Sequence, residues 1–235
     1  VTTRWGSAAV IESCSDAVQV VFLPRHGADH LTPPGAINYR AQIAGLKELE
    51  VDAVVSVCAV GSLRADLLPG SFAVLSDFID LTRHRADTFF DSDSGPVVHT
   101  DFTIPYCPRV SAALSKACAD TAAAFSPSAT YVGVEGPRYE SPAEIGLYAS
   151  WGGDVIGMTN LPEVVLAREA GLCYGALAVV TNLACGISPT PLDHSEVGQA
   201  MADAAVQLQA IVRKAIESLS EGGDCGCGSD CRLVI

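Results

Sequence analysis

The sequence predicts a single α/β domain in which helices flank a central, mostly parallel or mixed β-sheet. Short apolar runs of strand length alternate with longer segments in which apolar residues recur every three or four positions. The strand-like runs lie at 18–23, 53–57, 71–78, 130–134, 155–157 and 174–180, and the helical segments at 39–49, 110–125, 142–150, 161–170 and 195–219. Alternation of this kind is typical of a sheet covered by helices.

The size of the chain fits one domain. Its 235 residues, of which 49% are hydrophobic, can bury one large core, and we place the domain at residues 1–220. Residues 221–235 are rich in Gly, Asp and Cys, so we expect a flexible tail outside the core. This tail contains Cys225, Cys227 and Cys231 but no nearby His and no Cys-x2-Cys spacing. We therefore expect at most an incidental disulfide there, and no metal site.

Charge and hydropathy exclude several classes of protein. The formal net charge is −13, and the 14 Lys and Arg residues form no basic stripe, so nucleic acid and anionic membranes are poor partners. No apolar stretch approaches the roughly 18 residues of a membrane span, and residues 1–6 lack the apolar core of a signal peptide. We expect a cytoplasmic protein whose nine cysteines are thiols by default.

Two capping patterns set the phase of the predicted helices. Ser141-Pro142-Ala143-Glu144 combines a capping hydroxyl, a proline at the first helical position and a glutamate at the third, so a helix should begin directly after Glu140. Asp193-His194-Ser195-Glu196 has a similar arrangement with aspartate as the cap. His194 is therefore predicted to lie in the first turn of the last long helix.

Polar and aromatic side chains follow three of the predicted strands. They are Tyr139 and Glu140, Met158 and Thr159, and Thr181 and Asn182. We expect them to gather at one sheet edge, where open α/β sheets bind small ligands. An aromatic ring can stack on a planar ligand, a carboxylate can accept from ring N–H groups, and an amide can satisfy a purine edge. Structural explanations stay open: Tyr139 and Met158 as core residues, Glu140 in an ion pair, Asn182 in a loop.

Further candidate residues follow the first two strand-like runs, and one lies at the start of the last predicted helix. Arg25 can capture phosphate or carboxylate with two hydrogen bonds, with His26 beside it, although a salt bridge is the commoner explanation of such a pair. The small residues at 58–62 allow close approach of a ligand, or tight packing of a helix on the sheet. His194 can hydrogen-bond a ligand hydroxyl or simply be an exposed residue at a helix start.

With these residues in place, the chain resembles the trimeric purine nucleoside phosphorylase and methylthioadenosine phosphorylase family from about Phe22 to the last helix. The first half resembles the methylthioadenosine branch at Arg25-His26-Gly27, Asn38-Tyr39, Gly61-Ser62-Leu63-Arg64, Asp77-Phe78-Ile79-Asp80 and Ile104-Pro105-Tyr106-Cys107-Pro108. The second half resembles the purine nucleoside branch at Tyr139-Glu140-Ser141-Pro142-Ala143-Glu144, Thr181-Asn182-Leu183-Ala184-Cys185-Gly186 and His194-Ser195-Glu196-Val197. The resemblance implies the nucleoside phosphorylase fold.

The resemblance also implies a role for each candidate. Arg25, His26, Ala59 and Thr159 would contact phosphate, and Cys58, Tyr139, Met158, Thr181, His194 and His99 would contact the nucleoside. Glu140 would accept from the N1–H of a 6-oxopurine, while Asn182 would bond N7 and O6. His194 would reach the 5′-hydroxyl. His99 matches a position that enters the neighbouring subunit's site, which implies a homotrimer.

The implied reaction is phosphorolysis, with inorganic phosphate as co-substrate and no metal or organic cofactor. Asn182 would stabilise the charge arriving at N7 of the departing base. The aminopurine branch has acids where this chain has Asn182 and Ala184, and an amide N–H suits O6 but opposes an exocyclic amine. That mismatch costs about 1–3 kcal/mol, so we expect inosine and guanosine, with 5′-deoxy-5′-methylthioinosine as a further candidate substrate.

The chain departs from the family pattern at its beginning. Family members usually begin with a strand and a Gly-Gly-(Ser/Thr)-Gly turn around the phosphate, whereas residues 1–7 resemble a later segment, so we expect this element to be absent from the sequence. Three alternatives therefore stay open. They are a methylthioadenosine phosphorylase, a hydrolytic variant, and a noncatalytic purine nucleoside binder that lacks the phosphate loop.

Overall fold

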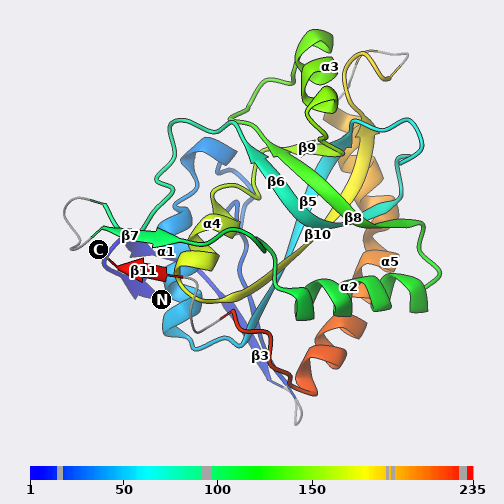
Figure 1. The fold of residues 1–235 in the computed structure, drawn as a ribbon. Helices are drawn as coiled ribbons and strands as arrows, with labels where there is room; N and C mark the ends of the chain where they lie inside the picture. Colours follow the sequence, from blue (N-terminus) through cyan, green and yellow to red (C-terminus); the bar gives the residue numbers. More distant parts are fainter. Residues whose placement is uncertain (15–17, 92–96, 189–190, 192–193, 228–231, 235) are drawn as a thin grey trace.

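The fold is centred on a closed five-stranded barrel (Figure 1). The structure, a computed structural model, describes residues 1–14, 18–91, 97–188, 191, 194–227 and 232–234. Around the barrel the order is β10 (Cys173–Leu183), β5 (Ala53–Ser62), β9 (Val155–Gly157), β8 (Phe125–Gly133) and β6 (Phe72–Asp80). Neighbours β10 and β5, β9 and β8, and β8 and β6 are parallel, whereas β5 and β9, and β10 and β6, are antiparallel. The single α/β domain with a mixed central sheet is confirmed, but the expected open edge is wrong, because β6 pairs with β10 and closes the sheet.

Helices cover the barrel on two sides (Figure 1). On one side α2 (Pro108–Asp120) and α5 (His194–Ser220) pack against each other and against β10. On another side α1 (Tyr39–Glu48), preceded by the short 3-10 helix η1 (Pro34–Ala36), packs against α4 (Glu163–Glu169), and α4 also contacts β10. Helix α3 (Pro142–Ser150) stands at one end of the barrel, at the top of Figure 1.

Strand β10 separates two cores because successive side chains of a strand point to opposite faces. Ala176, Ala178 and Val180 belong to the core shared with α1 and α4, whereas Leu177 and Val179 belong to the core shared with α2 and α5. Both faces are covered, so every position from 174 to 181 is buried. This burial explains why the strand is a continuous apolar run rather than an alternating one.

Local sequence rules account for the elements near the barrel end. The capping box predicted for α3 is confirmed, because the Ser141 hydroxyl accepts from the Glu144 amide and the Glu144 carboxylate accepts from the Ser141 amide at 2.8 Å. Helix α3 and strand β9 have the expected bounds. Strands β5, β8 and β10 extend beyond the expected runs, because barrel pairing continues through their polar ends.

Six short strands lie outside the barrel as two-stranded ribbons. The pairs are β1 (Thr2–Thr3) with β2 (Gly6–Ser7), β3 (Ile11–Cys14) with β4 (Gln19–Phe22), and β7 (Val98–Thr100) with β11 (Arg232–Val234). The run at 18–23 is thus a strand, but it belongs to a hairpin and not to the central sheet. Among the described residues, none of the helices combines the length and apolarity needed to cross a membrane.

The expectation that residues 221–235 lie outside the core is wrong in part. Cys227 is buried at 3% exposure and belongs to the core under α2 and α5. Further on, β11 pairs antiparallel with β7, with Leu233 opposite His99. The segment is rich in small and polar residues, but Cys225, Cys227 and the last strand have partners within the domain.

A buried guanidinium, Arg85, ties together the two loops that leave β8 and β9. Its side chain is only 2% exposed. Nη1 donates to the carbonyl oxygens of Met158 and Leu161, each at 2.6 Å, and Nη2 donates to the carbonyl oxygens of Val134 (3.3 Å) and Glu135 (2.8 Å). Nε donates to the Glu135 carboxylate at 3.2 Å. The planar fork of arginine satisfies carbonyl groups that would otherwise be short of donors.

We predict that replacing Arg85 destabilises the fold far more than replacing its exposed neighbour Arg83. Arg85→Met leaves buried carbonyl groups and Glu135 Oε1 without the Arg85 donor, at a cost of about 3–5 kcal/mol in the free energy of unfolding. Arg83→Met removes hydrogen bonds to the carbonyls of Thr82 and Asp80 at the surface, and should change stability by about 0.5 kcal/mol or less. Urea denaturation of both variants measures the difference, and equal losses would contradict the role assigned to Arg85.

Candidate active site

A row of paired residues crosses four neighbouring strands at one end of the barrel. Asn182 of β10 is paired with Gly61 of β5, Gly61 with Ile156 of β9, and Ile156 with Val132 of β8. Strands β8 and β9 each end one residue beyond this row. The loops that carry the predicted residues 139–140 and 158–159 therefore start near the level of Asn182, on other strands of the closed sheet.

The loop after β9 is fixed from beneath by the hydroxyl of Tyr131. This oxygen accepts hydrogen bonds from the amides of Thr159 (3.1 Å) and Asn160 (3.3 Å). The hydroxyl can reach them because residue 157 is glycine: a Cβ there would lie 2.6 Å from the Tyr131 hydroxyl oxygen. Thr159 is buried, and its backbone position is set before any ligand binds.

A chain of buried hydrogen bonds continues from this loop to a carboxylate. Asn160 accepts from the Tyr106 hydroxyl at 2.5 Å and donates to the Tyr174 hydroxyl at 2.9 Å. The Tyr174 hydroxyl in turn donates to Glu163 Oε1 at 2.7 Å. A buried network whose members are satisfied rigidifies the surrounding structure.

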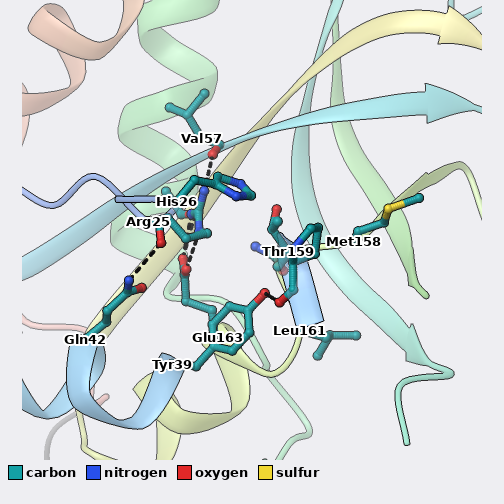
Figure 2. Close-up of polar contacts among 12 residues, drawn as sticks. Arg25, His26, Tyr39, Gln42, Val57, Met158, Thr159, Leu161 and Glu163 are labelled. Carbon is teal, nitrogen blue, oxygen red and sulfur yellow. Dashed lines mark hydrogen bonds and ion pairs between the residues drawn. The ribbon is translucent and has the colours of Figure 1, made fainter. Parts of the chain in front are cut away.

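Glu163 forms a buried ion pair with Arg25. Arg25 Nε lies 2.5 Å from Oε2 and Nη2 lies 2.8 Å from Oε1, while the Ser56 hydroxyl donates to Oε1 at 2.9 Å. Burial alone would raise the pKa of Glu163, but the Arg25 charge and these hydrogen bonds hold that pKa below its usual value. Figure 2 shows the Arg25 side chain between Val57 and Glu163.

Most N–H donors of the Arg25 guanidinium already form hydrogen bonds within the chain. Besides Glu163, it donates to the carbonyl oxygen of Val57 at 3.0 Å and to the Ser56 hydroxyl at 2.7 Å. Four hydrogen bonds thus use four of its five N–H donors. The structure therefore contains the salt bridge that the sequence left open as the alternative, with one N–H remaining for a ligand.

His26, the residue after Arg25, has one ring nitrogen anchored and one available. Nδ1 lies 2.8 Å from the carbonyl oxygen of Thr32, so Nδ1 carries the proton and Nε2 is the nitrogen that can act on a ligand. Burial lowers the pKa of His26 below its usual value, and the neighbouring His30 and Arg25 act in the same direction. The ring is neutral at pH 7.

Cys58 and Ala59 lie on β5, paired with Ala178 and Val179 of β10. Cys58 is buried, and burial raises the pKa of its thiol to about 12. It is therefore a protonated packing residue rather than a nucleophile. Ala59 is half-buried, two positions before the row at Gly61.

Glu140 lies at the same end of the barrel as Asn182. Burial raises the pKa of the Cys185 thiol, three residues beyond Asn182, and the Glu140 charge adds to this rise. The next residue, Gly186, packs against Pro142 so closely that a Cβ would meet Pro142 Cβ at 2.7 Å. Glu140 is 9% exposed, and burial raises the pKa of its carboxyl above the usual value. The segments that carry this acid and the Asn182 amide therefore pack against each other.

The amide of Asn182 is held by short-range contacts. Its Oδ1 accepts from the Thr181 hydroxyl at 2.9 Å, and its Nδ2 donates to the carbonyl of Leu183 at 3.0 Å. Thr181 is buried and also bonds the carbonyl of Val60 at 3.2 Å. One N–H of the amide and one lone pair of its oxygen remain for a ligand.

The remaining predicted residues differ in position and in exposure. Met158 packs on Gly136, where a Cβ would lie 2.3 Å from its sulfur, and Tyr139 is 36% exposed. His99 is exposed on β7, outside the barrel. His194 is the first residue of α5, as predicted, but its side chain lies outside the described residues.

Sequence reasoning missed the residues that hold the site in place. Glu163, Arg85, Tyr131 and Asn160 contribute most of the buried hydrogen bonds described above. Glu163 alone left a usable signal, since an acid within an apolar helical segment must find a partner when buried. The tyrosine and asparagine side chains meet only through tertiary packing, which no local pattern reveals.

Comparison with known proteins agrees with this arrangement. A family model described as the phosphorylase superfamily matches residues 9–217. A protein of Moorella thermoacetica named as a probable 6-oxopurine nucleoside phosphorylase is 44% identical over 97% of this chain and 87% of its own length. A Methanocaldococcus jannaschii protein named as a probable S-methyl-5′-thioinosine phosphorylase is 47% identical over 84% of this chain and 76% of its own.

A solved structure of a phosphorylase has a fold similar to that of this chain. Methylthioadenosine phosphorylase from Schistosoma mansoni, in complex with adenine, superposes with a TM-score of 0.90 and is 32% identical, covering 95% of this chain and 85% of that one. The matched family model and the two relatives span most of the barrel and its helices. The chain belongs to the phosphorylase superfamily.

Proposed function

We propose that this chain is an enzyme that cleaves 6-oxopurine nucleosides with inorganic phosphate, giving the free base and ribose 1-phosphate. The observation that carries the proposal is the packing of the loop after β10 on the start of α3, Gly186 against Pro142, which places the segments that carry Asn182 and the buried acid Glu140 at one end of the barrel. The similarity to a 6-oxopurine nucleoside phosphorylase over 97% of the chain supports the same substrate class.

The base would be recognised by complementary donors and acceptors. Glu140 accepts from the N1–H of the purine, while the available N–H of Asn182 donates to O6 or N7. Residue 184 is alanine, so no acid stands nearby to accept from an exocyclic amine. An adenine amine would face the amide donor instead, and a buried unsatisfied donor costs about 1–3 kcal/mol.

The phosphate would be held by hydrogen bonds more than by net charge. The Arg25 charge is neutralised by Glu163, and the neutral His26 can accept from a P–OH group through Nε2. The Thr159 hydroxyl, the backbone around Ala59 and the remaining Arg25 N–H complete the proposed set. These groups lie on β5, on the loop after β9 and on the segment before α1.

In the proposed reaction the bound phosphate attacks C1′ while the glycosidic bond lengthens. Negative charge moves onto the purine, and the Asn182 amide, held by Thr181, stabilises that charge at N7. The amide is already oriented, so little reorganisation accompanies the charge transfer. The reaction calls for no metal or organic cofactor.

A 5′-modified nucleoside is the second candidate substrate. The M. jannaschii relative, 47% identical, is named for a 5′-methylthio nucleoside with the same 6-oxo base. Its name agrees with the base recognition proposed above and differs only at the 5′ group. His194, at the start of α5, is the residue we assign to a free 5′-hydroxyl.

We propose that the functional unit is a homotrimer in which His99 enters the site of a neighbouring subunit. His99 is exposed on β7, where a second chain can contact it. Light scattering of the purified protein should give the mass of a trimer. A monomer that remains active would contradict both the assembly and the role of His99.

The first test of the function is an assay with three substrates. Inosine should release hypoxanthine only when phosphate is present, and adenosine should react about tenfold to a hundredfold more slowly, measured as kcat/KM. 5′-Deoxy-5′-methylthioinosine serves as the comparison at the 5′ position. Base release without phosphate would indicate hydrolysis, binding without turnover would indicate a nucleoside binder, and preference for adenosine would contradict the roles of Glu140 and Asn182.

The second test uses the raised pKa of Glu140. The ionised carboxylate accepts from N1–H more strongly than the neutral acid does, so kcat/KM for inosine at saturating phosphate should fall as the pH drops through a pKa above the usual value of about 4.5. Glu140→Gln keeps an acceptor oxygen but cannot titrate, so it should lower activity and remove this acid limb. Glu144→Gln is the comparison: Glu144 pairs with Arg138 at the surface, and its charge adds to the burial effect that raises the Glu140 pKa, so this variant should keep the acid limb and move it to lower pH. An unchanged acid limb in Glu140→Gln would refute the assignment.

A further inference from the structure

Four cysteine side chains converge at the opposite end of β10 from Asn182. They are Cys107, Cys173, Cys225 and Cys227, and their sulfur atoms all lie within 4.8 Å of one another. Cys107 precedes α2, Cys173 opens β10, and the other two belong to the segment after α5. Within the described part of the chain, no other group of His, Cys, Asp or Glu side chains has ligand atoms this close together.

The arrangement suits one centre rather than separate pairs. Tetrahedral zinc has Zn–S distances of about 2.3 Å, which puts neighbouring sulfurs about 3.8 Å apart. Cys173 and Cys225 are 3.1 Å apart, and all pairs are within 4.8 Å, so shifts of about 1 Å would give this tetrahedron. Two disulfides would require only two close pairs, whereas here every sulfur lies near the other three.

The surroundings carry the compensating charge that such a site needs. Zinc with four thiolates has a net charge of about −2, and such sites are stabilised by hydrogen bonds to sulfur. Arg109, two residues after Cys107, places its guanidinium beside Cys173 and Cys225. Its Nε is buried and, among the described residues, has no hydrogen-bond partner. Cys107 is also the N-cap of α2, at the positive end of that helix.

The segment after α5 folds over this cluster. Gly223, with φ of +138°, brings the backbone so close to Arg109 that a Cβ would lie 3.1 Å from Arg109 Cδ. The turn that follows points both Cys225 and Cys227 toward the two core cysteines, and Cys227 is buried. A Cys-x-Cys pair aimed at one point is a chelating arrangement.

We propose that Cys107, Cys173, Cys225 and Cys227 bind one Zn²⁺ as a tetrahedral tetrathiolate site that fastens the C-terminal segment to the barrel. Nine residues of strand separate Cys173 from Asn182, about 30 Å, so the ion is structural and takes no part in the reaction. The expectation of no metal site rested on the tail cysteines alone. It missed Cys107 and Cys173, which are distant in the sequence.

The test measures metal rather than activity. Protein produced with zinc in the medium and purified under a phosphine reductant without chelators should contain roughly one zinc per chain by plasma mass spectrometry. Exchange into Co²⁺ should give the intense charge-transfer absorption of tetrahedral cobalt thiolate. The Cys225→Ser/Cys227→Ser double variant should lose both signals, whereas Cys14→Ser, at an exposed cysteine on β3, should keep both.

Three results would overturn the proposal. They are zinc far below one per chain in the reduced wild-type protein, full zinc in the double variant, or a disulfide between any two of the four cysteines in protein isolated under nonoxidising conditions. Circular dichroism shows whether the double variant is folded. If it is not, zinc content and the cobalt spectrum of the wild-type chain still decide the question.

Discussion

The buried carboxylate of Glu163 is the constraint on which the rest of the candidate active site depends. An isolated carboxylate at this depth would cost several kcal/mol, so it requires the Arg25 guanidinium and the hydroxyls of Ser56 and Tyr174. These partners come from the segment before α1, from β5 and from β10. One charge therefore joins parts of the chain that are distant in sequence, and the loop carrying Thr159 rests on the same network.

Arg85 plays a comparable part at the neighbouring loops, and the two arginines together explain the electrostatics of the site. Each guanidinium is bound by other groups of the chain. Arg25 pairs with Glu163, and Arg85 pairs with Glu135 and donates to backbone carbonyls. The chain as a whole has a net charge of −13. A phosphate would therefore meet prearranged donors in a site with little excess positive charge, so its binding would depend on the precision of those donors.

Sequence patterns predicted the elements and the gathering of residues, but not the closure or the support. Caps and periodicity placed α3 and β9 at their observed bounds, and strand ends located the segments that carry Glu140 and Asn182. Closure of the barrel could not be predicted, because it depends on β6 pairing with β10, and pairing partners leave no local signal. For the same reason Arg25 was assigned to phosphate without Glu163, and Cys225 was interpreted without Cys173.

Closure also limits how copies of this chain can associate. Every barrel strand has a neighbour on both sides, so the barrel has no edge strand to which another chain could add. Free strand edges are found instead on the peripheral ribbons, among them the β7 and β11 ribbon that displays His99. Contacts between subunits must then be made by side chains over the barrel's helical cover or by these ribbons, and the central sheet is protected from fibre-forming association.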